Sequence, residues 1–95
     1  MNIRELHKSE KQVSATSLFK GELGIATSIQ IEKDGTLAEH FTKTQALLLC
    51  IFGEVTYRDE NEQALILKEG DYISIEPDVK HWLYSPIKSQ LILLK

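Results

Sequence analysis

Hydrophobic and polar residues alternate with a period of two over much of the chain. Between positions 23 and 32, small and polar residues separate Leu23, Ile25, Ile29 and Ile31. This alternation is typical of a β-strand with one face buried. The segment Ala46–Phe52 is instead apolar at every position and ends at Gly53. Its short length and the flanking glycine favour a strand buried on both faces over a helix.

Five further short segments are predicted to be strands: 54–58, 64–67, 72–76, 81–84 and 91–94. Turn-forming residues separate them, including the polar run 59–62, Pro77 and Ser85-Pro86. About seven to nine strands with turns every ~8–12 residues are typical of a sandwich or closed barrel, so the predicted fold class is all-β. The triplets Lys33-Asp34-Gly35 and Lys68-Glu69-Gly70 are similar, which suggests two related halves, as in a jelly roll.

The first twelve residues differ from the rest because they are highly charged and contain good helix formers. Ile3 and Leu6 are their apolar pair, which suits a short helix or an irregular edge segment equally well. His7 lies among charged residues, so it is expected to be solvated. The stretch is too charged for the apolar core of a signal peptide. We therefore expect one cytoplasmic domain over residues 1–95, with 1–12 as an N-terminal extension.

Composition narrows the function classes. The 11 basic and 14 acidic residues are scattered and give a net charge of −3, so nucleic acid is not an expected partner. No apolar run approaches the ~20 residues that a bilayer span needs, so no membrane partner is expected either. Cys50 is the only cysteine, which excludes an intrachain disulfide. Nothing cationic lies near it in sequence, and it is predicted to be an inert core thiol.

Two sets of residues resemble the cupin motifs. Gly70-Asp71, then Pro77, then His81 looks like the second cupin motif. The first motif is matched more loosely by Gly35, His40 and Gly53-Glu54-Val55. The resemblance covers roughly residues 23–94. It implies a small jelly-roll barrel, also called a double-stranded β-helix, with a cavity lined from His40 to Phe52 and near His81.

The resemblance also bears on metal binding. In metal-binding cupins the first motif supplies two histidines and a glutamate, and the second supplies a third histidine. The corresponding positions here hold His40, Thr42, Ala46 and His81. A catalytic divalent metal usually needs about three protein ligands, so two imidazoles would hold it weakly. Gln45 could add only a neutral carbonyl oxygen. No cofactor is therefore expected, with a weakly held divalent metal as the alternative.

Two function classes remain open. The first is a small-molecule-binding, accessory or sensor cupin whose pocket is formed by His40, Thr42, Gln45, Leu48, Phe52, His81 and Leu83. The second is a metal-dependent oxygenase or isomerase with His40 and His81 as ligands and Gln45 or water completing the shell. Because Thr42 and Ala46 replace a histidine and a glutamate, the sequence favours the binding protein. Whether the chain is an enzyme stays open, and the ligand is an unidentified small molecule.

Both faces of the strand Ala46–Phe52 are apolar, with Leu47, Leu49 and Ile51 on one face and Leu48, Cys50 and Phe52 on the other. The segment 91–94 is apolar on both faces in the same way. A small barrel cannot bury both faces by itself. We therefore expect the N-terminal segment, a partner or both to cover the outer face, and we predict a homodimer.

Overall fold

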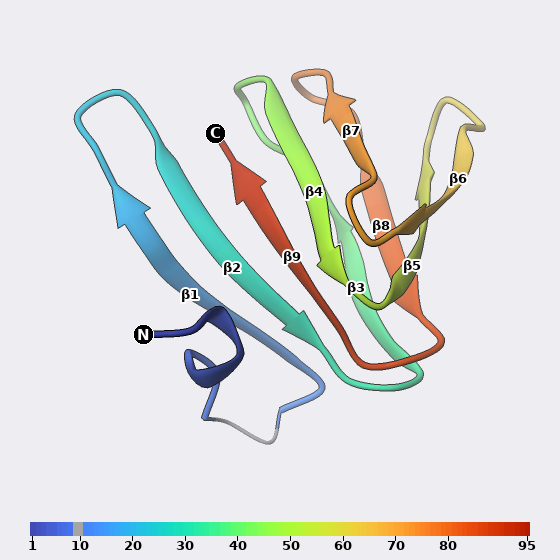
Figure 1. Ribbon diagram of the computed structural model, residues 1–95. Coiled ribbons are helices and arrows are strands. Elements are labelled where there is room, and N and C mark those ends of the chain that lie inside the picture. Colours follow the sequence, from blue (N-terminus) through green and yellow to red (C-terminus); the bar gives the residue numbers. More distant parts are fainter. Residues whose placement is uncertain (9–10) are drawn as a thin grey trace.

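The computed structural model describes residues 1–8 and 11–95, so two positions of the predicted 1–12 extension lie outside the described residues. The described chain forms nine strands in two antiparallel sheets, preceded by a short 3-10 helix, η1 (Ile3–Glu5) (Figure 1). The five-stranded sheet has the order β1 (Val13–Lys20), β2 (Ile25–Ile31), β9 (Ser89–Leu94), β4 (Ala46–Phe52) and β7 (Tyr72–Ile75). The four-stranded sheet has the order β3 (Gly35–His40), β8 (His81–Ser85), β5 (Glu54–Asp59) and β6 (Ala64–Lys68). None of the helices in this part of the chain has the length and apolar character to cross a membrane.

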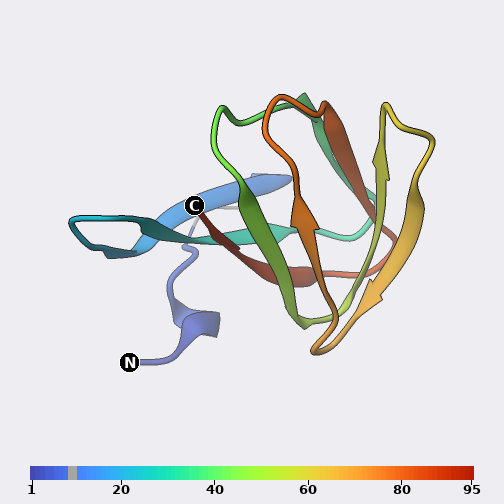
Figure 2. The same cartoon turned by 90° about the horizontal axis from the view of Figure 1, so that it is seen from above.

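The two sheets face each other in the view from above (Figure 2). The hydrophobic core lies between them. Along most strands alternate residues point inward, which is the period-two pattern of the sequence expressed in space. The innermost side chains come from both sheets and are almost fully buried: Ile31, Leu48, Cys50, Val55, Tyr57, Ile75, Leu83 and Leu91. The all-β prediction and the jelly-roll arrangement are confirmed.

Two strands escaped prediction from the sequence. The first, β1, is an edge strand that pairs only with β2, and five of its eight residues are exposed, so it has no clear buried face. The second, β3, begins at Gly35, directly after the turn between β2 and β3. Asp34 rather than the glycine adopts the left-handed conformation at that turn, with φ of 63°. Gly35 is needed for a different reason, since a Cβ there would lie 2.8 Å from the carbonyl oxygen of Glu32.

The N-terminal segment packs on the outer face of the five-stranded sheet. His7 was expected to be solvated, but its ring is half-buried and bridges two strands of that sheet. Its Nδ1 lies 2.9 Å from Ser14 Oγ, and its Nε2 lies 2.8 Å from Ser28 Oγ. The charged neighbours of His7 in the sequence concealed these contacts because both serines lie on later strands.

Candidate functional site

The two motif histidines meet at the upper end of the four-stranded sheet. His40 ends β3 and His81 begins β8, and the two residues are direct partners in the β3–β8 ladder. A register shift between Leu37 and His40 precedes this pairing, and such bulges commonly redirect a side chain. The imidazole centroids lie 4.1 Å apart in an edge-to-face arrangement. The fold thus brings together two residues that are 41 positions apart in sequence (81 minus 40).

Both histidines are held by the same backbone interaction. His40 Nδ1 lies 3.0 Å from the carbonyl oxygen of Ala38, and His81 Nδ1 lies 3.0 Å from that of Val79. Because a carbonyl can only accept a hydrogen bond, each Nδ1 must carry the hydrogen. In a neutral ring Nε2 then presents a lone pair. No hydrogen bond found among the described residues engages Nε2 of either ring, so the two acceptors are available to a ligand.

Tyr57 and Asp59 support this pair from β5. Asp59 is the ladder partner of His81, and the Tyr57 ring stacks on His81 with a centroid distance of 5.9 Å. The Tyr57 hydroxyl donates to Asp59 Oδ2 at 3.0 Å. Asp59 Oδ1 accepts two backbone N–H groups of the following turn, from Asn61 and Gln63. Both carboxylate oxygens are therefore occupied, and Asp59 serves to position Tyr57 and to place a negative charge near His81.

Sequence reasoning missed Tyr57 and Asp59. The signal that could have found them is the alternation in β5, where Val55, Tyr57 and Asp59 share the inward face. A carboxylate at the end of an inward-facing row is unusual, because charged residues are seldom buried without a partner. The sequence alone could not show that this row lies against His81, since that depends on the β5–β8 register.

Burial governs the protonation of the site. Burial lowers the pKa of His81 from its ordinary value of 6.5, and the neighbouring His40 lowers it further, while the Val79 carbonyl and Asp59 act in the opposite direction. His81 is therefore neutral at pH 7 and acts as an acceptor through Nε2. Burial also raises the pKa of the Tyr57 hydroxyl, and its hydrogen bond to Asp59 adds to the effect. That hydroxyl remains a donor at every physiological pH.

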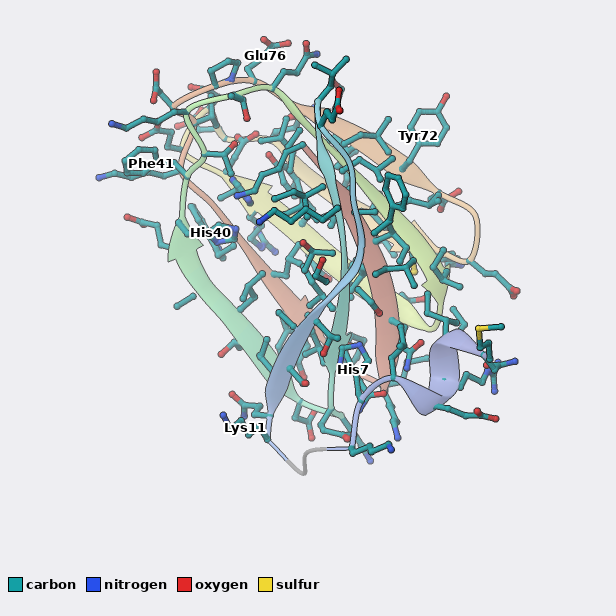
Figure 3. All side chains as sticks on the ribbon, turned by 90° about the vertical axis from the view of Figure 1, so that its left-hand side faces the viewer. His7, Lys11, His40, Phe41, Tyr72 and Glu76 are labelled. Atoms are coloured by element: carbon teal, nitrogen blue, oxygen red, sulfur yellow. The ribbon has the colours of Figure 1, made fainter. Side chains whose placement is uncertain are left out.

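Two loops form the rim above the histidines. The loop between β3 and β4 is tied to the loop between β7 and β8 by the Asp78 N–H, which donates to the Thr42 carbonyl at 2.7 Å. Glu39 and Lys80 add an exposed ion pair at 3.8 Å. Figure 3 shows His40 at the end of β3 with Phe41 beside it at this rim, whereas His7 lies lower on the sheet. The rim leaves His40 partly accessible while His81 is only 2% exposed.

The barrel interior next to the pair is filled by side chains. Leu48 and Leu83, which were predicted to line the pocket, are almost fully buried members of the hydrophobic core. Thr42 is also buried, and its hydroxyl donates to the Thr44 carbonyl at 2.7 Å, which stabilises the rim loop. A ligand of the histidine pair must therefore be compact and must enter from the rim, over His40.

Two predicted pocket residues lie elsewhere. Gln45 donates to Ser74 Oγ at 2.9 Å and lines a groove on the outside of the five-stranded sheet. Phe52 was expected to face inward with Cys50, but a register shift between these residues pairs Phe52 with Gln90 instead. The Arg4 guanidinium lies 4.2 Å from the centre of the Phe52 ring. Neither residue joins His40 and His81, because local strand geometry reverses the face that simple alternation predicts.

The donor set does not fit a resident divalent metal. Across residues 1–8 and 11–95, no three His, Cys, Asp or Glu side chains come close enough to hold one ion together. Thr42 directs its hydroxyl to the backbone, Gln45 lies outside the barrel, and both Asp59 oxygens accept other hydrogen bonds. Two imidazoles remain, one fewer than the protein ligands of a typical catalytic zinc site.

Comparison with known proteins extends this picture. No family model and no curated protein matches the sequence. A cupin superfamily protein from Desulfitobacterium hafniense superposes with a TM-score of 0.86 at 14% identity, covering 98% of this chain and 84% of that one. A conserved protein with a double-stranded β-helix domain from Klebsiella pneumoniae gives 0.85 at 17% identity, with 99% and 85% covered.

A third similar structure belongs to the DMSP lyases RdDddP and RnDddQII. It has a TM-score of 0.81 at 12% identity, covering 86% of this chain and 46% of that one. Identities this low carry information about fold and not about activity. Together with the sheet order and the placement of the two motif histidines, the three likenesses establish that this chain has the fold of a small cupin, the double-stranded β-helix barrel.

Proposed function

We propose that the protein is a small-molecule-binding cupin barrel whose ligand binds at the rim, against His40 and His81. The observation that carries the proposal is the paired arrangement of two imidazoles, 4.1 Å apart, with each Nδ1 bonded to a backbone carbonyl. Binding sites typically combine an apolar wall with a few convergent polar groups. Here the convergent polar groups are the two Nε2 atoms.

The chemistry of the pair defines the ligand. Each Nδ1 donates to a backbone carbonyl, so Nε2 is the free nitrogen of each ring. Nε2 of the neutral His81 accepts a hydrogen bond, so a matching ligand carries an N–H or O–H donor. The Asp59 carboxylate near His81 favours a neutral or cationic ligand over an anion. Because the interior is filled, the ligand is compact. Such binding suits a sensor or accessory protein, and the unpaired Cys50 supports a cytoplasmic location.

Matched fragments test this proposal. Small amines, amides and phenols are compared with their methylated, donor-free counterparts while the imidazole nitrogen resonances are followed by NMR. We expect only the donor-bearing member of each pair to shift the Nε2 signals of His40 and His81. His40→Phe should weaken that binding by about tenfold, the effect of one lost hydrogen bond. Gln45→Ala should leave it unchanged. Equal binding of the donor-free counterparts would contradict the proposal.

Metal analysis distinguishes this proposal from the competing enzyme class. The DMSP lyases show that this fold accommodates enzymes, but the incomplete donor set makes a metal-dependent oxygenase or isomerase the weaker hypothesis here. Protein purified without an affinity tag is dialysed and its metal content measured. Near-stoichiometric metal that His40→Ala or His81→Ala releases would replace the binding proposal by the enzyme reading.

A further inference from the structure

The outer face of the five-stranded sheet is divided into two halves. In the lower half, the N-terminal segment covers the sheet, with His7 bonded to Ser28 and Arg4 over Phe52. Ile92, whose side chain points to this outer face, is only 7% exposed as a result. In the upper half a groove of about 840 Å³ remains open. No residue of the N-terminal segment lines it, and the sheet itself separates it from the histidine pair.

The groove is apolar and lies beside a projecting hairpin. Its walls come from the β1–β2 hairpin, the beginning of β4 and the end of β9, and include Phe19, Leu23, Ala26, Leu47 and Leu94. The ladder places Ala26, Leu94 and Leu47 side by side in one outward-facing row. The hairpin extends beyond the rest of the barrel in the view from above (Figure 2). At its tip Leu23 is fully exposed, and Phe19 is 66% exposed.

We propose that this groove is the contact surface between two copies of the chain, with the hairpin tip of each copy lying in the groove of the other. A two-fold contact uses the same patch on both partners and must therefore be self-complementary. The hairpin supplies a projection, and the groove directly beside it supplies the matching hollow on the same face. The proposal concerns a surface outside the ligand site and does not depend on the proposed function.

The charges of the surface are also complementary. Glu22 lies at the hairpin tip, and Lys95 lines the groove at the end of β9. In a reciprocal contact the carboxylate of one tip approaches the ammonium group of the partner's groove, twice per dimer. Lys20, another charged residue of the hairpin, ends β1 and is not part of the groove lining. Complementary charges of this kind set the orientation of partners more than their affinity.

The exposed apolar area suits a dimer. A stable interface buries about 800 Å² on each partner. Phe19 and Tyr72, which share this face, are each about two-thirds exposed. Since an aromatic side chain can bury about 150–250 Å², the two rings alone would supply roughly a quarter to two-fifths of that requirement. Leu23 and Leu94 and the groove floor add to it, and monomers seldom leave so large an apolar patch open to water.

Sedimentation velocity over a range of micromolar concentrations tests the proposal. We expect the wild-type protein to sediment at twice its 10.8 kDa chain mass. Leu23→Asp and Phe19→Asp should each weaken association roughly 30-fold or more, as expected for central interface residues. Ile66→Asp is the matched control, because Ile66 is 58% exposed on β6 in the other sheet and should leave association unchanged. Urea unfolding midpoints verify that each variant is folded.

Charge reversal then tests the reciprocal geometry. Glu22→Lys and Lys95→Glu should each weaken association, and the double variant should restore it, because the opposite charges meet again across the two-fold axis. A monomer at every concentration overturns the proposal. So does a dimer that Leu23→Asp leaves intact, which would assign the contact to another surface such as the free edge of β1. Equal weakening by Ile66→Asp, or no restoration in the double variant, overturns it as well.

Discussion

The hydroxyl of Tyr57 is expected to stabilise the fold through Asp59, and Tyr57→Phe isolates that contribution. The ring is 1% exposed and packs on His81, and phenylalanine retains this packing. The substitution removes only the bond from the hydroxyl to Asp59 Oδ2, which is 3.0 Å long. Asp59 is itself only 6% exposed, so water cannot readily replace the lost donor.

The expected loss is about 1.5–3 kcal/mol of unfolding free energy, the usual contribution of a hydrogen bond to a charged group. In a domain of this size each kcal/mol corresponds to about 4–8 °C in melting temperature. Urea unfolding at pH 7.5, followed by circular dichroism and tryptophan fluorescence, measures the change. The slope of the transition should stay constant, because the packed area is unchanged.

Tyr84→Phe is the matched control for this experiment. The Tyr84 hydroxyl also donates to an aspartate, Asp34 Oδ1, at 2.8 Å, but Tyr84 lies on the surface. Water can replace that bond, so its unfolding midpoint should equal that of the wild type. If both variants lose the same stability, or if Tyr57→Phe loses less than about 0.5 kcal/mol, burial of the Tyr57–Asp59 pair is not the source of its strength.

Three further expectations concern the backbone, pH and the thiol. Gly53→Ala should lower the unfolding free energy more than Gly70→Ala, as measured by urea unfolding. Both glycines have φ near 89°, but a Cβ at Gly53 would lie 2.7 Å from a backbone carbonyl oxygen, whereas at Gly70 it meets nothing within 4 Å. Equal losses would mean that backbone strain alone decides. Burial lowers the pKa of both His7 and His81, so folding excludes a proton that the unfolded chain binds. The unfolding free energy should therefore be constant above about pH 6.5 and fall below it, by at most about 1.4 kcal/mol per pH unit for each histidine. A urea unfolding midpoint that does not change down to pH 5.5 would refute this. Burial and nearby carboxylates raise the pKa of the Cys50 thiol to about 11. A disulfide reagent at pH 8 should therefore modify this thiol only after denaturation. Rapid modification of the native protein would contradict the placement of Cys50 in the core.

The fold class and most strands could be predicted without a structure, because alternation and turn residues are local signals in the sequence. The segment Ala46–Phe52 was predicted with its observed bounds, and the strands around His81 and Leu91 were found within two residues. A single domain over residues 1–95 and a small-molecule ligand are predictions from the same sequence. The motif histidines were singled out by their spacing from turn glycines and Pro77, a pattern that also lies within short stretches of chain.

The residues that surround those histidines could not be predicted in this way, because they come from other strands. Tyr57 and Asp59 reach His81 through the register of β5 against β8, which no local pattern encodes. Phe52 turned to the outer face because a register shift interrupted the alternation of β4. His7, which was expected to be solvated, is hydrogen-bonded to two strands that follow it in the chain. The physical reason is the same each time: periodicity fixes which side chains share a face of one strand, whereas cross-strand pairing and bulges fix what that face meets.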